Sequence, residues 1–498
     1  MVISTRRSLA LFVLCGVAAC SDATAPPAPV TPTPSDTATP AILREMRGVW
    51  IATVANIDWP SRNTLTADQQ RAELDDLLDR AALAGLNAVF FHARPASDAV
   101  YQSALEPWGA MLTGTQGRDP GYDPLAYAVN AAHARGLELH AWINPFRAGN
   151  TRDSLALAPS HLFRTRRNLL RVYGSQLWLE PGDAEVHDHV MRVVLDIVRR
   201  YDIDGIHADD YFYPYQERDA ANRLIDFPDS ATWAQSGTTL ARDDWRRANV
   251  DRFVERLQRE VHAIRPTLKV GISPFGIWRP GNPPGVNGLD AWASIFADSR
   301  KWLQQGWVDY LAPQLYWSIA APQQSFPALL DWWMAQNSRG RHVWPGLAVY
   351  RVLDGTTSAF PVSEITDQVR LTRSRSGAPG HLLYNATSTL RRSGGLVASS
   401  LAPLYGTRAL VPAFPWLDSD APLAPALAVA GTTLTFTPAI GEAPRWWFVR
   451  ARASTGWTTR VLFGDARTST LTAAPDRVLL SAVDQAGNVS PPAEWRAR

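Results

Sequence analysis

Short apolar runs recur along the chain from residue 46, each separated from the next by a polar loop and an amphipathic stretch. The runs are continuous and do not alternate, which is typical of strands buried on both faces of a parallel sheet. The eight runs are "RGVWIATV" (47–54), "NAVFFHA" (87–93), "LELHAWIN" (137–144), "IDGIHAD" (203–209), "KVGISPF" (269–275), "VDYLAPQLYW" (308–317), "HVWPGLAV" (342–349) and "GHLLYNA" (380–386).

Helical periodicity lies between these runs and predicts helices over 69–84, 124–135, 183–200, 243–264 and 362–373. The first two end at Gly85 and Gly136, where a helix terminus favours a residue in the left-handed conformation. Eight strands alternating with helices predict an α/β fold, a (β/α)8 TIM barrel over 44–410. A doubly wound sheet is the alternative, but no glycine-rich phosphate-binding sequence follows the first strand.

The pattern changes beyond residue 410. Short β runs separated by Gly, Pro and Asn replace the helical period, and they predict a small all-β sandwich over 411–498. Its ending, "VDQAGNVSPP", resembles the last strand of a fibronectin type III-like module. We expect this domain to serve in packing or weak binding.

The first twenty residues have the features of a secretory signal. Arg6 and Arg7 precede an apolar run too short to span a bilayer, and small residues follow, up to Cys20. The ending "VAAC" resembles a bacterial lipoprotein processing site, which predicts lipidation of Cys20; ordinary signal cleavage nearby is the alternative. Residues 21–43 are rich in Pro, Thr and Ala, and predict an extended tether.

Composition describes a globular protein, with 46% apolar and 19% charged residues. Both cysteines, Cys15 and Cys20, fall in the signal segment, so the mature body has no disulfide or cysteine metal site. Without Arg6 and Arg7, 47 basic residues balance 47 acidic ones, and no nucleic-acid partner is expected. The 20 tryptophans and 13 tyrosines indicate either a large core or a groove lined with rings.

Polar and aromatic residues gather at the carboxyl ends of the predicted strands, where active sites lie in this barrel fold. Because rings stack on apolar sugar faces and sugar hydroxyls need polar partners, the set predicts a glycan-binding groove. We expect the rings among these residues to line one groove. The candidate substrate-binding residues are Trp59, His92, Arg94, Asn144, Arg147, His207, Tyr211, Tyr213, Trp278, Arg279, Gln314, Tyr316 and Trp317.

The stretch "IDGIHADDYFYPY" (203–215) carries the main candidate acids. Side chains alternate along a strand, so Ile206 and Ala208 share one face and His207 and Asp209 share the other. Because the apolar Ile206 and Ala208 suit contact with the surrounding helices, His207 and Asp209 are expected to point toward the barrel axis. Asp209 is therefore the predicted general acid, and Asp210 either the second carboxylate or the partner of an arginine. Asp204, at the beginning of the strand, is expected to have a structural role.

If the glycan-binding groove also cleaves glycosidic bonds, a second carboxylate is normally needed, and the sequence does not fix which residue supplies it. The sixth strand ends in Gln314, and Asp58 after the first strand is a candidate, with Asp98 and Asp290 less favoured. An N-acetyl group of the substrate could instead act as the nucleophile.

Metal chemistry is a further alternative, since His92, His140 and His207 lie in three predicted strands and could join Asp209 in a metal site. No His-x-His pair follows the first strand, however, and no Glu-paired His motif occurs on a helix. We expect neither a metal nor a cofactor, and a hydrogen-bonding role for His207.

Six segments resemble the glycosyl hydrolase-like 10 family, barrel proteins often found as bacterial lipoproteins. They are "EMRGVWIATVANIDWPS" (45–61), "FHARPASDAVY" (91–101), "HAWINPFR" (140–147), "DGIHADDYFYPY" (204–215), "GISPFGIWR" (271–279) and "YLAPQLYW" (310–317). The resemblance implies a (β/α)8 fold and action on glycans, with peptidoglycan glycan strands as the suspected substrate.

Together these features predict a glycoside hydrolase held to the cell envelope by a lipid at Cys20, at the outer membrane or periplasmic face of a Gram-negative bacterium. The alternative is a non-catalytic glycan-binding lipoprotein, and a third class is a purely structural envelope lipoprotein. Release of reducing ends from glycans separates the first from the others.

Overall fold

The computed structural model describes residues 39–377, 379–441 and 443–497. Residues from Pro40 onward form one compact unit. The predicted signal segment, Cys20 and the tether up to residue 38 lie outside the described residues. Within the described part of the chain, no helix combines the length and the apolar character that crossing a bilayer requires.

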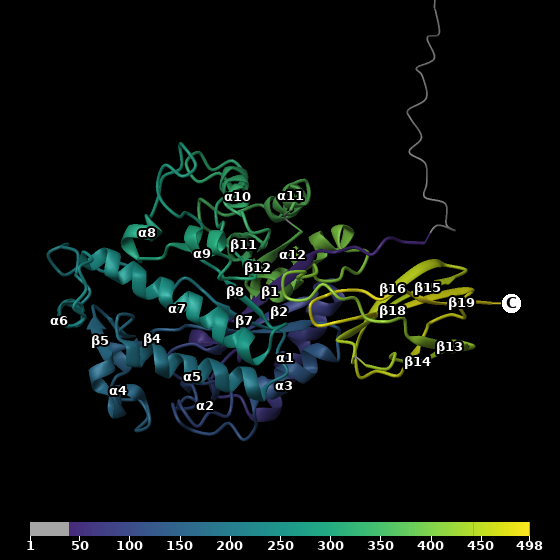
Figure 1. Ribbon diagram of the computed structural model, residues 1–498, viewed down its shortest axis with the longest axis horizontal. Helices are drawn as coiled ribbons and strands as arrows, with labels where there is room; N and C mark the ends of the chain where they lie inside the picture. The colour runs from purple at the N-terminus through teal and green to yellow at the C-terminus, as the bar shows by residue number, and fades with distance from the viewer. Residues whose placement is uncertain (1–38, 378, 442, 498) are drawn as a thin grey trace, which may run out of the picture. The chain divides into compact units, whose positions relative to one another are not determined.

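A parallel sheet forms the centre of the first domain (Figure 1). Its strands run in the order β10-β9-β8-β7-β3-β2-β1-β12-β11. Each of the eight predicted apolar runs contributes to it. The strands are β1 (Met46–Ile51), β2 (Ala88–Arg94), β3 (Glu138–Ile143), β7 (Gly205–Ala208), β8 (Lys269–Ile272), β9 (Tyr310–Leu311), β10 (His342–Val343), β11 (Gly346–Ala348) and β12 (Gly380–Tyr384).

The two ends of this sheet, β10 and β11, are consecutive in the chain and come from the single predicted strand 342–349. Pro345 separates them because it has no amide hydrogen to donate. The segment still bonds to both neighbours: Trp344 N donates to Leu311 O at 2.9 Å and Leu382 N donates to Pro345 O at 3.0 Å. The sheet therefore closes on itself in a TIM-barrel-like α/β fold.

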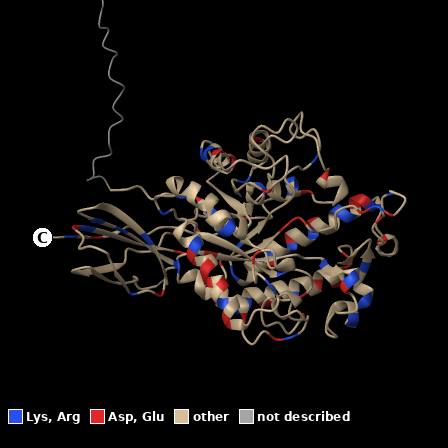
Figure 2. Cartoon of the chain, turned by 180° about the vertical axis from the view of Figure 1, so that it is seen from behind, with Lys and Arg blue, Asp and Glu red and all other residues tan. Residues whose placement is uncertain are grey.

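The five predicted helices are all present, and their ends differ from the predictions by at most two residues. They are α1 (Ala67–Leu83), α3 (Pro124–His133), α5 (Ala184–Arg200), α7 (Arg242–Ile264) and α11 (Val362–Arg373). Shorter helices lie in the loops: α2 (Ala110–Thr113), α4 (Leu162–Thr165), α6 (Ser230–Gln235), α8 (Ala291–Ser294), α9 (Ser299–Gln305), α10 (Phe326–Ala335) and α12 (Leu396–Leu401). Basic and acidic residues are interspersed along the helices in Figure 2, as the balanced composition suggests.

A small antiparallel sheet after β3 was not predicted; it consists of β4 (Arg147–Asn150), β6 (Gln176–Leu179) and β5 (Leu170–Tyr173). The C-terminal part holds two further antiparallel sheets, as expected of an all-β domain. One contains β13 (Ala426–Ala430), β14 (Thr433–Thr437) and β17 (Thr468–Thr470), and the other contains β16 (Gly456–Phe463), β15 (Trp446–Ala453), β18 (Arg477–Val483) and β19 (Ala493–Arg496).

A row of hydrogen bonds runs through the buried interior of the barrel. Trp50 Nε1 donates to His207 Nε2 at 3.1 Å, and Tyr310 Oη lies 3.1 Å from His207 Nδ1 and 2.9 Å from His140 Nδ1. His140 Nε2 continues the row to Glu138 Oε2 at 3.2 Å, and Glu138 pairs with Lys269 at 2.5 Å. Burial lowers the pKa of both histidines, so both are neutral near pH 7 and each donates one proton along the row.

Two strand glycines make room for these rings. A Cβ at Gly205 would overlap the His140 imidazole, and a Cβ at Gly271 would overlap the Tyr310 ring. Glycine normally weakens a strand, and it is retained where another group approaches closely. Gly205 and Gly271 are therefore needed so that the rings of His140 and Tyr310 fit in the polar interior.

The β domain contributes one arginine to the amino-terminal end of the barrel. Asp204 is fully buried there and accepts hydrogen bonds from Arg445 Nε at 2.8 Å, Leu139 N at 2.8 Å and His133 Nε2 at 2.9 Å. Arg445 also pairs with Asp202 at 2.6 Å. These contacts agree with the structural role expected for Asp204.

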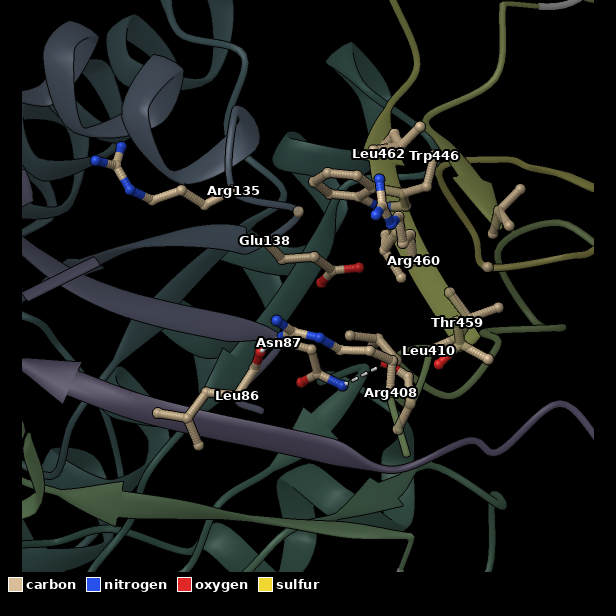
Figure 3. Close-up of a pocket in the computed structure, with 16 residues that line it drawn as sticks. Leu86, Asn87, Arg135, Glu138, Arg408, Leu410, Trp446, Thr459, Arg460 and Leu462 are labelled. Carbon is tan, nitrogen blue, oxygen red and sulfur yellow. Dashed lines mark hydrogen bonds between the residues drawn. The ribbon is translucent and has the colours of Figure 1, made fainter. Parts of the chain in front are cut away.

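Beside this ion pair lies a cavity of about 200 Å³, between the amino-terminal strand ends and the β domain (Figure 3). Glu138, Arg408, Trp446 and Arg460 are among its lining residues. Its one acidic residue in the described chain, Glu138, is already paired with Lys269. This cavity therefore lacks the pair of acids that hydrolysis of a glycoside requires.

Candidate active site

A larger cavity of about 380 Å³ opens at the carboxyl ends of the strands, the end at which barrel active sites lie. Its walls are rich in aromatic and polar side chains. They include Trp50, His92, Trp142, Asn144, Arg147, Asp209, Asp210, Tyr211, Tyr215, Ser273, Gln314, Tyr316, Tyr350 and Tyr384. The size falls within the range of about 300–1,000 Å³ that is common for small-ligand sites.

Asp209 and Asp210 follow β7 directly and are 6% and 3% exposed. Asp209 Oδ1 accepts a hydrogen bond from Tyr211 N at 3.3 Å, and Asp210 Oδ2 accepts one from the Tyr215 hydroxyl. Among the described residues that line the cavity, these two are the only acids. The structure therefore brings two of the three acids of the stretch 203–215, Asp209 and Asp210, together on one wall.

Asp209 and Asp210 differ in proton affinity because their surroundings differ. Burial, with the charge of Asp210 as the next cause, raises the pKa of Asp209 to about 8. Burial also raises the pKa of Asp210, but hydrogen bonds from Tyr215 and Gln314 oppose this rise. Two adjacent buried acids cannot both ionise readily, so near neutral pH the pair retains one proton, which sits on Asp209.

Several polar atoms on the cavity wall are buried without a hydrogen-bond partner among the described residues: His92 Nδ1, Asn144 Nδ2 and Ser273 Oγ. His92 Nε2 lies 2.7 Å from Asn144 Oδ1, and the imidazole stacks on Trp142 with ring centroids 3.7 Å apart. Burial lowers the pKa of His92 to about 3, so the ring is neutral and its Nδ1 is an acceptor. Unpaired buried groups cost free energy, so a ligand with hydroxyl and amide groups would satisfy them.

Arg147 presents a positive charge to the cavity. Its guanidinium carbon lies 5.2 Å from the centre of the Tyr211 ring, and its positive charge acts against the rise in the pKa of Asp209. A group of this kind can bind a substrate oxygen or carboxylate.

Eight of the residues predicted from the sequence line this cavity: His92, Asn144, Arg147, Asp209, Asp210, Tyr211, Gln314 and Tyr316. The other eight do not. Asp58 is 1% exposed and accepts hydrogen bonds from Ala52 N and Thr387 N, both at 2.8 Å, so its two oxygens are occupied by the backbone. Burial raises the pKa of Asp58 to about 6, but the carboxyl group holds the chain after β1 and lies outside the cavity.

Arg94 and His207 are buried in polar contacts of their own. Arg94 forms a two-point ion pair with Glu106, at 2.8 and 2.5 Å. His207 bonds to Trp50 and Tyr310 in the barrel interior and does not bond to Asp209 or face the cavity. Arg279 pairs with Asp290 at 3.2 Å in a loop outside the cavity.

The expected groove of six rings is not formed, because four of the rings pack elsewhere. Trp59 is fully buried and donates to Gln70 O at 2.8 Å, and Tyr213 is buried with its hydroxyl 3.4 Å from Asp229. Trp278 donates to Asp298 at 2.9 Å and stacks on Trp332. Trp317 packs against Phe275, with ring centroids 5.7 Å apart.

Other rings take the place of these four. Trp50 and Trp142 come from within β1 and β3, Tyr215 from the loop after β7, Tyr384 from the end of β12 and Tyr350 from the turn after β11. Tyr316 stacks on Tyr384 with centroids 5.9 Å apart. Tyr384 lies near the end of the eighth predicted run, 380–386, so its position close to a strand end was a signal present in the sequence.

The histidines do not form a metal centre. Across the described residues, no group of three or more His, Cys, Asp or Glu side chains is arranged to hold a metal ion. His140 and His207 share Tyr310 as a hydrogen-bond partner below the cavity, while His92 bonds to Asn144 at its edge.

A proton-holding acid pair in an aromatic cavity, at the carboxyl end of a TIM-barrel-like sheet, defines a site of the glycoside hydrolase type. The model of the family described as "Glycosyl hydrolase-like 10" matches residues 45–359, and the chain belongs to this family.

Two curated relatives carry related names. Glycosyl hydrolase YngK of Bacillus subtilis (strain 168) is 40% identical over 394 residues, which cover 77% of this chain and 76% of the relative. Glycosyl hydrolase DigH of Escherichia coli (strain K12) is 33% identical over 375 residues, which cover 70% of this chain and 84% of the relative. Among solved structures, the PgaB (BpsB) glycoside hydrolase domain from Bordetella bronchiseptica aligns over 74% of this chain and all of that domain, with a TM-score of 0.49 and 16% identity.

Proposed function

We propose that this protein is an envelope-anchored glycoside hydrolase that cleaves O-glycosidic bonds of a polysaccharide, with peptidoglycan glycan strands as the substrate. The observation that carries the proposal is the buried pair Asp209 and Asp210, which holds a proton near neutral pH inside a cavity lined by rings. In this scheme Asp209 is the general acid, because a proton donor near pH 7 needs a raised pKa. A binding module has no need of such a pair.

The test is release of reducing ends from purified peptidoglycan glycan strands by the full chain. The proposal expects new reducing ends to accumulate with time and with protein concentration. Binding of the strands without release would instead favour the alternative, a non-catalytic glycan-binding lipoprotein.

The rate of cleavage should depend on pH through the acid pair. Because the pKa of Asp209 is about 8, its proton is present below that pH and lost above it, so kcat/KM should fall as pH rises through about 8. On the acid side, activity should fall when Asp210 gains a proton, at a pH above the ordinary value for aspartate. A pH profile of kcat/KM checks both limbs, and a rate that keeps rising above pH 9 would contradict the assignment.

Arg147→Met should weaken glycan binding about tenfold or more, since a hydrogen bond from a charged group is worth about 1.5–3 kcal/mol. The matched control is Arg279→Met, because Arg279 is paired with Asp290 and lies outside the cavity. Binding isotherms of both variants in an Asp209→Asn background measure the difference without turnover. Equal weakening by the two variants would remove Arg147 from the binding site.

We also propose that Cys20 carries the lipid. Cys20→Ala should leave the protein unprocessed or soluble, whereas the wild type should partition into detergent with the membrane. The residue after the cysteine is Ser21 and not an aspartate. In a Gram-negative envelope, a serine at this position favours the outer membrane. Equal partitioning of the two proteins would contradict the anchor.

The β domain is proposed to be fibronectin type III-like. The arrangement of three strands in one sheet and four in the other supports this. Its proposed role is structural, because Arg445 reaches the buried Asp204 of the barrel.

A further inference from the structure

The two acids of the cavity stand on the same wall. They are neighbours in the chain at the end of β7, and no other described acid lines the cavity. In a closed sheet of this order β7 and β12 are opposite one another, and the side chain that β12 contributes is Tyr384. Glycosidases with two acting carboxylates place them on either side of the bond, about 5–5.5 Å apart when the configuration is retained and about 6.5–9.5 Å apart when it is inverted. Among the described residues that line the cavity, those facing Asp209 include tyrosines and Trp50 but no carboxylate for that second role.

Asp58, the second carboxylate considered from the sequence, does not fill the gap. Both of its oxygens accept backbone hydrogen bonds, and it lies outside the cavity. The tyrosine hydroxyls are poor nucleophiles as well, because burial raises the pKa of Tyr384 and Tyr316 above the ordinary value. The described residues of the cavity therefore supply a proton donor and a neighbouring carboxylate, but no nucleophile across the bond.

We propose that the substrate supplies the nucleophile, as the carbonyl oxygen of a 2-acetamido group on the sugar whose bond is cleaved. The inference rests on the proposed glycosidase function and specifies the substrate class: a glycan with a 2-acetamido sugar, its acetamido group trans to the bond. Asp209 is the acid, and Asp210 binds the acetamido N–H. The Tyr215 hydroxyl bonds to Asp210 and orients it for that contact.

In the first step the Asp209 proton passes to the glycosidic oxygen, the acetamido oxygen bonds to C1, and the C1–O bond to the leaving sugar breaks. The leaving sugar departs as an alcohol, and Asp210 takes the N–H proton of the resulting cyclic cation, leaving a neutral oxazoline. In the second step a water molecule gives a proton to Asp209 and bonds to C1. The bond from C1 to the acetamido oxygen breaks, and Asp210 returns the proton to nitrogen. One water is consumed, and the configuration at C1 is retained.

The polar atoms left unpaired on the wall suit such a sugar. Asn144 Nδ2 and Ser273 Oγ can donate hydrogen bonds to ring oxygens and hydroxyls, and His92 Nδ1 can accept one. The methyl group of an acetamido substituent is apolar and requires an apolar surface, which the rings of Trp50, Tyr316 and Tyr384 provide.

The test compares one glycan in two forms with the full chain: fully N-acetylated glycan strands, and the same strands after chemical N-deacetylation. The free amine of the second form cannot make the oxazoline, so its cleavage should be at least about 100-fold slower than that of the acetylated form, in line with the loss of a catalytic group. NMR during the reaction should show the product first as the retained anomer. Equal cleavage of both forms, or an inverted product, would overturn the inference while leaving the glycosidase function in place. Cleavage of neither form would overturn the proposed function, and the inference with it.

A stable sulfur analogue of the intermediate, the methyl thiazoline of N-acetylglucosamine, gives a readout of binding without turnover. It should inhibit the wild type, and Asp210→Asn should weaken its binding at least about tenfold, because the contact to the ring nitrogen is lost. Asp290→Asn is the matched control, since Asp290 lies outside the cavity and caps α8. Unchanged binding to Asp210→Asn would remove Asp210 from the role assigned to it.

Discussion

Asp209→Asn is expected to lower the rate of glycan cleavage by about 10²–10⁴-fold and to leave glycan binding nearly unchanged, since this is the usual contribution of a general acid. Asparagine has nearly the same shape but no proton to give to a leaving oxygen. Single-turnover rates and binding isotherms for the same glycan separate the two effects. Asp210→Asn should also be severe. Wild-type turnover in Asp209→Asn, together with an inactive Asp210 or Asp58 variant, would place the proton on another residue.

A stability measurement supplies the control. Folding raises the pKa of Asp209 from about 3.9 to about 8, so between these values the folded protein binds more protons than the unfolded chain. The free energy of unfolding that this group contributes therefore falls as pH rises from about 4 to 8. Asp209→Asn should accordingly be more stable than the wild type at pH 8 and similar to it at pH 4. Lower stability of the variant at pH 8 would mean that lost activity reflects misfolding.

Arg445→Met should lower the free energy of unfolding by about 3–5 kcal/mol, because the fully buried Asp204 loses its arginine partner and keeps only the hydrogen bonds of His133 and Leu139. Urea unfolding at pH 7 measures the loss. Arg452→Met is the matched control within the same domain: its pair with Asp476 is partly exposed and should be worth about 0–1 kcal/mol. Equal losses in the two variants would show that the buried pair has no special weight.

Two further observations identify the cause. Asp204→Asn in the Arg445→Met background should recover part of the stability, because the buried charge is then absent. The pKa of Asp204 is lowered well below its usual range, with Arg445 as the main favourable partner against burial. The stability from this pair is therefore present above about pH 4 and lost as pH falls toward the lowered pKa, and Arg445→Met should flatten that acid limb.

Most of the fold could be predicted from the sequence because its signals are local. Apolar runs between helical segments identified every strand of the barrel, and Gly85 and Gly136 marked two helix ends. The split of the seventh strand at Pro345 was also present in the sequence, since proline cannot donate to a ladder. The small sheet of β4, β5 and β6 was missed because its strands are short and lie within a loop.

The site was predicted in part, for a reason that applies to strand ends in general. Position at a carboxyl end of a strand indicates one end of the barrel, and Asp209, Asn144 and Arg147 do line the cavity at that end. It does not indicate where a loop residue folds back, so Trp59 and Trp278 were assigned to the cavity although Trp59 is fully buried and Trp278 packs on Trp332 outside the cavity. Conversely, Trp50 and Trp142 lie within strands, and only their inward direction brings them to the cavity floor.

The row of hydrogen bonds along the barrel axis has one possible direction. Trp50 can only donate, so His207 must hold its proton on Nδ1, Tyr310 must donate to His140, and His140 must donate to Glu138. Each ring proton is thus fixed at a known atom and shielded from water by the surrounding strands. In deuterated solvent these protons should exchange only when the barrel itself opens, and more slowly than the amides of its loops. The Trp50 ring also lines the cavity, so exchange of its indole proton reports barrel opening close to the proposed site. NMR can follow this exchange with and without a bound glycan.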